Sequence, residues 1–407
     1  MTRNILAVSL FFLAPTCWGQ SLSGMWDVTI NYNGNDIPFK MGISGEGSNV
    51  KGWFFNGKDK EVSNRGKFEN GVLTLDFDSY AAHLKATYKD GVLTGDYGPV
   101  VRKMSTIRAV RAAETKAAPT GKVPEIGGVW DLMMQTNSSK GENAWNLIVR
   151  QNGPELAAAI LRVDGDTGEL TGSYKDGKFT LSHFSGSRPS LMIITPQADG
   201  SLDVGLASLR GFTPMKALRL EEAKAKGLPM PTDADSHTQV KDPTKPFAFS
   251  FPDLNGKLVS NTDARFDGKV VLVVITGSWC PNCHDEAPYL EQVYEKYKGQ
   301  GLEVVALSFE EGDQLTDPTR LKAFIEEYGI KYTVLLCGEP DQAKDKLTQA
   351  QNWDAWPTTF FVGRDGLVKA VHAGFPGPAS GELFKKETSE FVARVEKLLG
   401  ANQNAKK

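Results

Sequence analysis

Short apolar segments separated by turn residues mark the first part of the chain. Asn70-Gly71 and Asp90-Gly91 each stand between two segments in which apolar and polar residues alternate. Asn-Gly and Asp-Gly pairs favour two-residue hairpin turns because both residues tolerate positive φ. Residues 20–111 are therefore expected to form an antiparallel β module, with strands near residues 26–30, 50–55, 72–77, 84–88 and 92–97.

Residues 126–221 repeat the order of features found in residues 20–111. Gly24-Met25-Trp26-Asp27 corresponds to Gly128-Val129-Trp130-Asp131, and residues 66–75 align with residues 172–181. Matches in the same order over about a hundred residues indicate two duplicated antiparallel β modules, barrel-like or sandwich-like. The Gly-x-Trp start resembles that of lipocalin-type barrels. Four aromatic residues of the modules are expected in their cores: Trp26, Trp53, Phe54 and Trp130.

Two segments without apolar periodicity separate the larger units. Residues 112–125 are rich in Ala, Lys, Thr and Pro, and residues 222–246 are polar with several prolines. Such composition is typical of linkers, and we expect the second segment to be extended and mobile.

From residue 247 the pattern changes to alternating strands and helices. Residues 269–276 hold an almost continuous apolar run, which is typical of a strand buried on both faces of a sheet. Residues 281–298 place apolar side chains at helical spacing. The segments that follow predict strands at 302–309, 332–336, 358–362 and 367–372, and helices at 317–328, 341–351 and 381–399. This order predicts an α/β fold with a mixed sheet over residues 247–400, followed by a tail at 401–407.

Composition excludes several classes of protein. The chain has 407 residues, a hydrophobic fraction of 40%, a charged fraction of 23% and a formal net charge of −3. These values are ordinary for a globular protein of several domains. Because the chain has no long basic block, a nucleic-acid partner has little electrostatic basis.

Residues 1–19 have the layout of a secretory signal peptide. Arg3 precedes an apolar stretch at residues 5–13, which is too short to span a bilayer, and Cys17-Trp18-Gly19 offers a small-residue cleavage site. Lipid attachment at Cys17 is disfavoured because the preceding Ala14-Pro15-Thr16 does not match a lipoprotein signal. No later segment is long and apolar enough to anchor the mature chain. The protein is therefore expected to be periplasmic or secreted.

One closely spaced pair of cysteines suggests thiol chemistry. Cys280 and Cys283 follow the buried strand directly and open the helix, where unpaired N–H groups and the helix dipole favour a thiolate. Cys280 is expected to be the exposed nucleophile, and Cys283 to attack the mixed disulfide and release the substrate. Cys337 is expected to be a buried small hydrophobe. No metal and no cofactor is expected, since no second ligand pair is spaced to complete a tetrahedral site with the two cysteines.

Two motifs resemble those of a known family. Trp279-Cys280-Pro281-Asn282-Cys283-His284-Asp285-Glu286-Ala287-Pro288 and Trp356-Pro357-Thr358-Thr359-Phe360-Phe361-Val362 resemble the TlpA/ResA-like thiol-disulfide oxidoreductases of the thioredoxin fold, within the redoxin superfamily. The resemblance implies a thioredoxin-like fold in which a cis-Pro357 faces the cysteine pair and Gly374 follows the last strand. It further implies that Trp279, Trp356 and Pro357 dock the substrate, and that Glu286 handles protons near the thiols.

The sequence departs from thioredoxin at one position that matters for proton transfer. Thioredoxin keeps a buried Asp six residues before its first cysteine, where this chain has Val274. Glu286 is the candidate proton acceptor for Cys283, and the alternative is an exposed carboxylate in the first turns of the helix. His284 is expected to be a solvated helix residue, with a cation beside the thiols as the alternative.

Four functions fit these observations to different degrees. The favoured one is an exported thiol-disulfide oxidoreductase that reduces protein disulfides and is recharged by an upstream electron-donor thiol protein. Cys280-Pro281-Asn282-Cys283-His284 also matches covalent c-type haem attachment. A redoxin-type thiol peroxidase is the third function, although its Pro-x-x-x-Thr-x-x-Cys pattern is missing before Cys280. In the fourth, the β modules bind a ligand or partner and the thioredoxin-like domain is a passenger.

Overall fold

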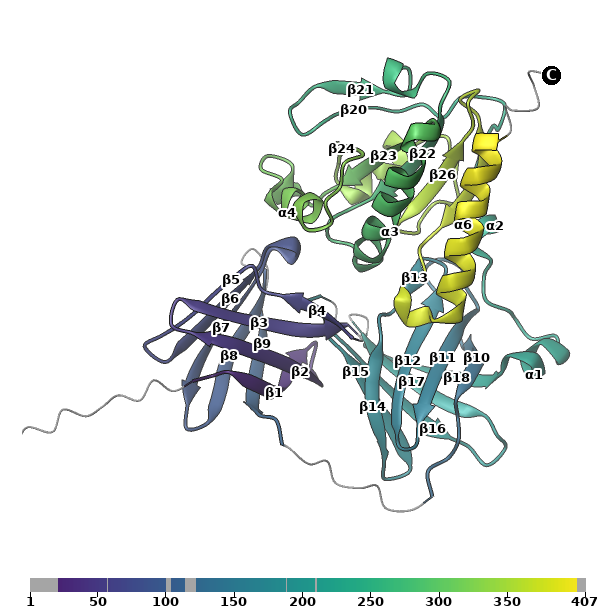
Figure 1. Ribbon diagram of the computed structural model, residues 1–407. Coiled ribbons are helices and arrows are strands. Elements are labelled where there is room, and N and C mark those ends of the chain that lie inside the picture. Colours follow the sequence, from purple (N-terminus) through teal and green to yellow (C-terminus); the bar gives the residue numbers. More distant parts are fainter. Residues whose placement is uncertain are drawn as a thin grey trace, which may run out of the picture.

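The computed structural model describes residues 21–56, 58–99, 104–113, 122–187, 189–208 and 211–400. They form two antiparallel β modules and an α/β domain (Figure 1). The expected signal peptide with Cys17, most of the first expected linker and the tail at 401–407 lie outside the described residues. Among the helices described, none is long and apolar enough to cross a membrane.

Module 1 is one antiparallel sheet with strands in the order β4-β3-β2-β1-β9-β8-β7-β6-β5. The sheet curls so that β5 comes against the turn before β3, where Phe68 N donates to Gly47 O at 2.7 Å. Both predicted hairpins are present, with positive φ at Asn70-Gly71 and Asp90-Gly91. The strands are β1 (Gly24–Tyr32), β2 (Asn35–Glu46), β3 (Asn49–Asn56), β4 (Asp59–Val62), β5 (Arg65–Glu69), β6 (Val72–Phe77), β7 (Ala82–Lys89), β8 (Val92–Pro99) and β9 (Ser105–Arg111), with the short helix η1 (Asp78–Tyr80) after β6.

Module 2 is an antiparallel barrel that closes on itself. Strand β11 pairs with both β10 and β12, so eight strands form the barrel, and β13 adds to the edge of β12. The strands are β10 (Gly128–Met134), β11 (Ala144–Asn152), β12 (Glu155–Arg162), β13 (Gly165–Asp166), β14 (Leu170–Lys175), β15 (Lys178–His183), β16 (Ser190–Pro196), β17 (Leu202–Ser208) and β18 (Gly211–Arg219).

The two modules hold their first tryptophan in the same way. The indole nitrogens of Trp26 and Trp130 each donate to the carbonyl oxygen four residues upstream at 2.9 Å. An arginine from the last strand lies over each ring, with Arg111 4.5 Å from the Trp26 centroid and Arg219 3.8 Å from that of Trp130. Each arrangement joins the first strand of its module to the last.

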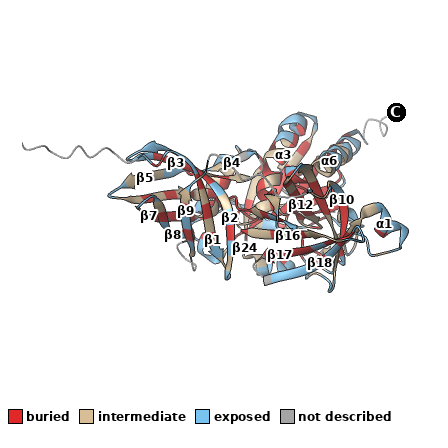
Figure 2. Cartoon of the chain, turned by 90° about the horizontal axis from the view of Figure 1, so that it is seen from below, coloured by how far each residue is buried: buried red, intermediate tan, exposed pale blue. Residues whose placement is uncertain are grey.

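Three of the four aromatic residues predicted for the module cores are buried there. Trp26, Phe54 and Trp130 are 0%, 0% and 2% exposed. The prediction was wrong for Trp53, which lies on the outer face of β3 with Lys60 Nζ 4.5 Å from its ring. Successive strand residues point to opposite faces, so Trp53 and Phe54 could not both lie in one core. Figure 2 shows buried positions gathered along the strands, while the outer surfaces of the helices are exposed.

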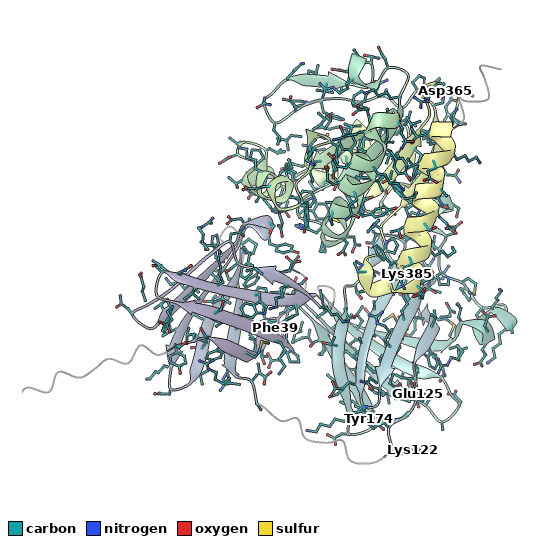
Figure 3. All side chains as sticks on the ribbon, in the orientation of Figure 1. Phe39, Lys122, Glu125, Tyr174, Asp365 and Lys385 are labelled. Carbon is teal, nitrogen blue, oxygen red and sulfur yellow. The ribbon has the colours of Figure 1, made fainter. Side chains whose placement is uncertain are left out.

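Phe184 joins the two modules. It follows β15 of module 2, yet its ring lies in the aromatic core of module 1, 4.8 Å from Phe54 and 5.1 Å from Tyr97. Phe39, on the side of module 1 that faces module 2 (Figure 3), lies 4.6 Å from the same ring. Tyr97 Oη donates to Gly186 O at 2.6 Å. A ring of module 2 therefore completes the core of module 1, which we call the shared core.

The carboxy-terminal domain has the mixed sheet that was predicted. Its strand order is β24-β23-β22-β26-β27. Three strands are parallel to one another: β22 (Val270–Thr276), β23 (Leu302–Phe309) and β24 (Thr333–Gly338). Strand β26 (Thr358–Val362) pairs antiparallel with β22, and β27 (Val368–Ala373) pairs antiparallel with β26. All seven residues of β22 are buried, as expected for a strand covered on both faces.

The three longer helices lie on one face of this sheet. Apolar side chains of α3 (Pro281–Tyr297), α4 (Thr319–Glu327) and α6 (Glu382–Gly400) pack against Leu272 and Val274. The other face is covered by the segment that carries β20 (Ser250–Pro252) and β21 (Leu258–Ser260) and by residues around α5 (Ala343–Lys346). The helix predicted at 341–351 is shorter than expected: α5 ends at Lys346, and β25 (Ala350–Gln351) follows it.

The segment 222–246 differs from the extended, mobile linker that was expected. It contains the end of α1 (Leu220–Ala225), α2 (Ala234–His237) and β19 (Gln239–Val240), which pairs with β25. Asp235 accepts from His372 at 2.7 Å and pairs with Arg394, and His237 lies 2.7 Å from Asp354. These contacts join residues more than a hundred positions apart, which local composition cannot reveal.

We expect Phe184→Ala to destabilise module 1, whose core this ring completes. Removing a buried Phe from a shared core costs about 3–5 kcal/mol, because the cavity is only partly refilled. The measurement is urea unfolding followed by tryptophan fluorescence. Phe212→Ala is the matched control, since Phe212 is 53% exposed on module 2 and its loss should change the free energy of unfolding little. Equal effects of the two variants would contradict the shared core.

Candidate functional site

Cys280 lies where strand β22 turns into helix α3. It is the N-cap residue of the helix, Pro281 occupies the first helical position, and Cys280 O accepts from Cys283 N at 3.0 Å and His284 N at 3.2 Å. No disulfide joins Cys280 to Cys283. A thiol at this position meets the positive end of the helix dipole, which favours its ionisation.

Cys280 is not the exposed nucleophile that was expected. Only 3% of Cys280 and 1% of Cys283 is exposed. From the sequence of the thioredoxin-like domain alone, the first thiol was expected to lie at the surface. Here residues of module 2 come to within hydrogen-bond distance of the same motif, with Asn282 Nδ2 donating to Asp164 O at 2.6 Å.

Segments far apart in sequence meet around the thiol. The peptide between Trp356 and Pro357 is cis, as the resemblance implies. The Cys280 thiol donates to Trp356 O at 3.6 Å, and Gly374 N donates to Pro357 O at 2.7 Å. The cysteine pair, the Trp356-Pro357 segment and Gly374 are thus brought together.

Trp279 and Trp356 form an aromatic wall beside Cys280. Their ring centroids are 5.2 Å apart, and Trp353 lies 4.9 Å from Trp356. Trp279 Nε1 donates to Phe309 O at 2.9 Å, which fixes the orientation of the indole. Both Trp279 and Trp356 are half-buried and so keep surface available to another chain.

Glu286 is buried, not the exposed helix carboxylate that was the alternative. It is 3% exposed and accepts from Thr359 Oγ1 at 3.1 Å. Burial raises the pKa of Glu286 to about 8. Burial also raises the pKa of Cys283 well above its usual range, and the hydrogen bond with Cys280 and the charges of Cys280 and Glu286 act in the same direction. Glu286 is therefore near enough to Cys283 to influence its ionisation.

The prediction of a solvated His284 was wrong. The residue is 6% exposed, and its ring stacks on Tyr80 of module 1 with centroids 4.9 Å apart. His284 Nε2 donates to Ser278 O at 2.8 Å, and Nδ1 lies 2.9 Å from Tyr328 Oη. Burial lowers the pKa of His284 to about 4, so the ring is neutral at physiological pH. With both nitrogens engaged and both cysteines buried, these residues do not fit covalent haem attachment.

A buried ion pair that the sequence did not reveal supports the loop before Cys280. Glu310 is 0% exposed and pairs with Arg320 at 2.9 Å. Its carboxylate also accepts from Ser278 N at 2.8 Å and Ser278 Oγ at 2.6 Å. The sequence did contain one signal for a role of Glu310 at the site. Glu310 directly follows β23, and the carboxyl ends of neighbouring parallel strands meet at one edge of a sheet.

Cys337 is a buried thiol outside the cysteine pair. Cys337 is 2% exposed in the core on the face of the sheet opposite α3, and burial raises the pKa of its thiol well above the usual range. This agrees with the expected packing role. Among the described residues, no group of three or more His, Cys, Asp or Glu side chains could hold a metal ion.

We expect Glu286→Gln to make stability less sensitive to pH. The carboxyl of Glu286 has a folded pKa of about 8 and an unfolded value near 4.5. The folded state therefore binds the proton more tightly, and this contribution to stability is lost as pH rises from 4.5 to 8. At pH 8 the free energy of unfolding of the Gln variant should exceed that of the wild type by on the order of 4 kcal/mol. At pH 4 the two free energies should differ little. Glu382→Gln, at an exposed position of α6, is the control for urea titrations at both pH values; parallel curves for wild type and Glu286→Gln would contradict the assignment.

Comparison with known proteins places the carboxy-terminal part of the chain. A profile of the AhpC/TSA family matches residues 223–371. The chain is similar to the thiol-disulfide oxidoreductase ResA of Bacillus thuringiensis (strain Al Hakam), with 33% identity over 120 residues that cover 30% of this chain and 62% of that protein. ResA of Bacillus subtilis (strain 168) is 31% identical over 126 residues, covering 31% of this chain and 64% of that protein. The chain thus spans less than two thirds of the length of these relatives.

Among solved structures, the chain is similar to a thiol:disulfide interchange protein of the thioredoxin family from Chlorobium tepidum TLS. The identity is 24% and the TM-score 0.31, with 40% of this chain and all 100% of that chain covered. The resemblance carried by residues 279–288 and 356–362 is confirmed by the sequence matches. Residues 223–371 therefore form a redoxin domain similar to the ResA group of thiol-disulfide oxidoreductases.

Proposed function

We propose that the protein is an exported thiol-disulfide oxidoreductase that reduces disulfide bonds in other proteins. The observation that carries the proposal is the placement of Cys280 at the N-cap of α3, 3.6 Å from Trp356 O, with Cys283 one turn behind it. One thiol is thus set at the positive end of a helix, and the second is buried where it can attack only the first.

The reaction proceeds in two exchanges. The Cys280 thiolate attacks one sulfur of the substrate disulfide, so that a bond forms between Cys280 Sγ and the substrate while the second substrate sulfur leaves as a thiolate and takes up a proton. Cys283 then loses its proton and attacks Cys280 Sγ, which releases the first substrate sulfur. The substrate gains two electrons, and the protein ends with a disulfide between Cys280 and Cys283.

Glu286 is the proton acceptor for the second exchange. The Cys283 thiol holds its proton tightly because it is buried, so its attack requires a base inside the protein. The Glu286 carboxylate is held by Thr359 Oγ1 and has a pKa of about 8, which lets it take and return a proton near neutral pH. No carboxylate stands at Val274, where thioredoxin has one.

The substrate docks as an extended segment beside the thiols. Trp356 O can accept from an incoming backbone N–H, Pro357 supports that segment, and the half-buried rings of Trp279 and Trp356 offer apolar contact. The partners of the proposal are protein disulfides as substrates and a thiol protein as electron donor. An expected signal peptide at residues 1–19 would take the chain to the periplasm or outside the cell, where disulfides persist.

We also propose that the two modules arose by duplication. The shared support of Trp26 and Trp130 by Arg111 and Arg219 favours this, because the matching residues occupy the first and last strands of both modules. The hairpins of β5–β6 and β14–β15 correspond in the same way.

We expect Cys283→Ser to trap substrates on Cys280. Without the resolving thiol, the mixed disulfide should persist and appear as a mass increase that dithiothreitol removes. The control is the Cys280→Ser variant, which should trap nothing. The proposal would be overturned if Cys283→Ser, like the control, captured no disulfide peptide. It would also be overturned if the wild type consumed peroxide as fast as it reduced disulfides. A redox titration of the pair then gives the direction of exchange.

We expect the second exchange to depend on pH through Glu286. Its rate should rise as pH approaches about 8, because only the ionised carboxylate accepts the Cys283 proton. Glu286→Gln should remove this rise and slow the step by about 10²-fold at pH 8. Stopped-flow release of a chromogenic thiol from the mixed disulfide at Cys280 measures it. Glu382→Gln is again the control, and an unchanged pH profile in Glu286→Gln would assign the proton to another group.

A further inference from the structure

A turn of module 2 lies against the place where the substrate would dock. We call residues Val163–Asp166 the tip; they comprise the turn after β12 and the short strand β13. We call residues 355–357 and 373–375 the docking edge, since they flank Cys280. The side chain of Val163 is 3% exposed and packs with Ala355 and Ala373 in one small apolar cluster. Figure 1 shows β13 at the end of module 2 that faces the carboxy-terminal domain.

The tip also makes the backbone contacts that an extended substrate would make. Gly165 forms a parallel bridge with Phe375, and Asp164 O accepts from Asn282 Nδ2 at 2.6 Å. Asn282 stands between the two cysteines, so this bond reaches the cysteine motif itself. Main-chain pairing of this kind is how extended peptides bind along exposed edges.

Two glycines are required by how closely the chains approach. A Cβ added to Gly165, at φ +120°, would lie 2.3 Å from Phe375 O and 2.7 Å from Asn282 Nδ2. A Cβ added to Gly374, at φ +74°, would lie 2.2 Å from Val163 O. Each glycine thus leaves room for the backbone of the other segment.

Module 2 holds the tip in this shape by its own contacts. Glu142, 2% exposed, accepts from Val163 N at 2.8 Å, and Lys140 Nζ donates to Asp164 Oδ2 at 2.6 Å. The carboxy-terminal domain holds the far end of the tip, since Ser380 Oγ donates to Asp166 Oδ2 at 2.7 Å. A preorganised turn loses little conformational entropy when it binds, which favours its contact with the docking edge.

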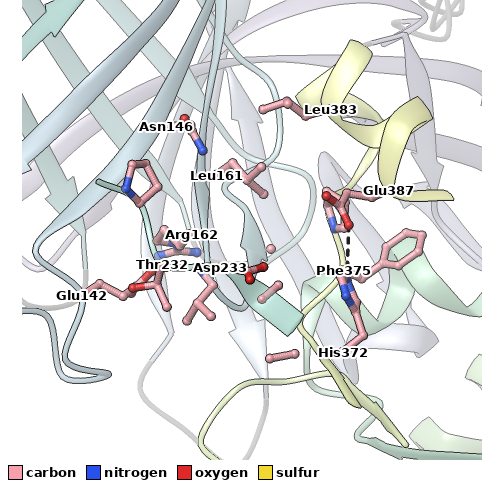
Figure 4. Close-up of a pocket in the computed structure, with 16 residues that line it drawn as sticks. Glu142, Asn146, Leu161, Arg162, Thr232, Asp233, His372, Phe375, Leu383 and Glu387 are labelled. Carbon is pink, nitrogen blue, oxygen red and sulfur yellow. Dashed lines mark hydrogen bonds and ion pairs between the residues drawn. The ribbon is translucent and has the colours of Figure 1, made fainter. Parts of the chain in front are cut away.

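The surroundings of the tip are less tightly filled. Figure 4 shows a pocket beside it, lined by Leu161 and Arg162 of module 2, Thr232 and Asp233 of the linker, and His372 and Glu387 of the carboxy-terminal domain. Module 2 also contacts the domain outside the tip, where Arg150 Nη1 donates to Ala379 O at 2.7 Å. Moving the tip away from residues 355–357 and 373–375 would clear the docking edge.

We propose that the tip occupies the docking edge in place of substrate, and that Asn282 positions substrate by binding one of its main-chain carbonyls, as it binds that of Asp164. The inference rests on the proposed function. A substrate segment that fits is extended, with a small branched apolar side chain for the Val163 position and a residue without a side chain at the Gly165 position. Substrate and tip compete for one edge, and the closed protein is latent.

Displacement of the tip should expose Cys280. In Gly165→Ala the added methyl group collides with Phe375 O, and in Val163→Asp a carboxylate replaces the side chain between Ala355 and Ala373. Both variants should be alkylated at Cys280 by iodoacetamide at least about tenfold faster than the wild type, because the rate follows the fraction of open molecules. Mass spectrometry locates the modification. Gly153→Ala is the matched control, since Gly153 has φ +56° on the same module with nothing within 4 Å.

Asn282 is tested in the opened protein. Adding Asn282→Ala to Gly165→Ala should raise KM for a disulfide peptide about tenfold, the usual scale for one lost hydrogen bond, and leave kcat unchanged. A purely structural role of Asn282 would lower the melting temperature without this split. An unchanged KM would overturn the positioning role.

The outcomes separate the two proposals. Equal and measurable alkylation of Cys280 in the wild type and in both tip variants would overturn occupation of the edge and leave disulfide exchange standing. No alkylation in any variant would overturn both proposals, because the thiol would then be unreactive even when uncovered. Faster alkylation in the two tip variants but not in Gly153→Ala supports the latent state, provided that all three variants have the same melting temperature.

Discussion

Cys280 stands at the turn from a fully buried strand into a helix, and the geometry of that turn constrains the structure around it. The strand β22 needs cover on both faces, which the helices provide on one side and the β20–β21 segment on the other. The turn itself must present a thiol to the helix dipole without leaving polar groups unpaired. The buried Glu310–Arg320 pair meets that need by binding Ser278, and the loop before the cysteine is thereby held in one conformation.

Burial around the thiol keeps most nearby groups neutral. His284 is deprotonated and Glu286 protonated at neutral pH, and Cys283 keeps its proton because all three lie inside the protein. An environment of this kind makes each proton transfer depend on the few groups whose pKa is close to the working pH, which here is Glu286.

Local patterns made part of this structure predictable. The apolar run of β22, the helical spacing of α3 and the Asn-Gly and Asp-Gly hairpins all depend on neighbours in sequence, and they appear where expected. Burial of Cys280, neutrality of His284 and the ordering of residues 222–246 could not be predicted, since they depend on distant segments. Tyr80 is two hundred residues from the ring it stacks on. A carboxylate directly after a buried parallel strand, as at Glu310, was the one overlooked signal.

The ring of Phe184 inside module 1 has a consequence for any movement of the modules. Because this ring of module 2 lies in the core of module 1, displacing the tip as proposed would also draw Tyr80 of module 1 away from His284. Whatever binds module 1 more strongly in the open arrangement would raise the fraction of accessible Cys280. By thermodynamic reciprocity, substrate bound at the thiol would strengthen that distant binding by the same factor. In the proposed latent state, Phe184 would thus link the contact at the tip to the contact at Tyr80.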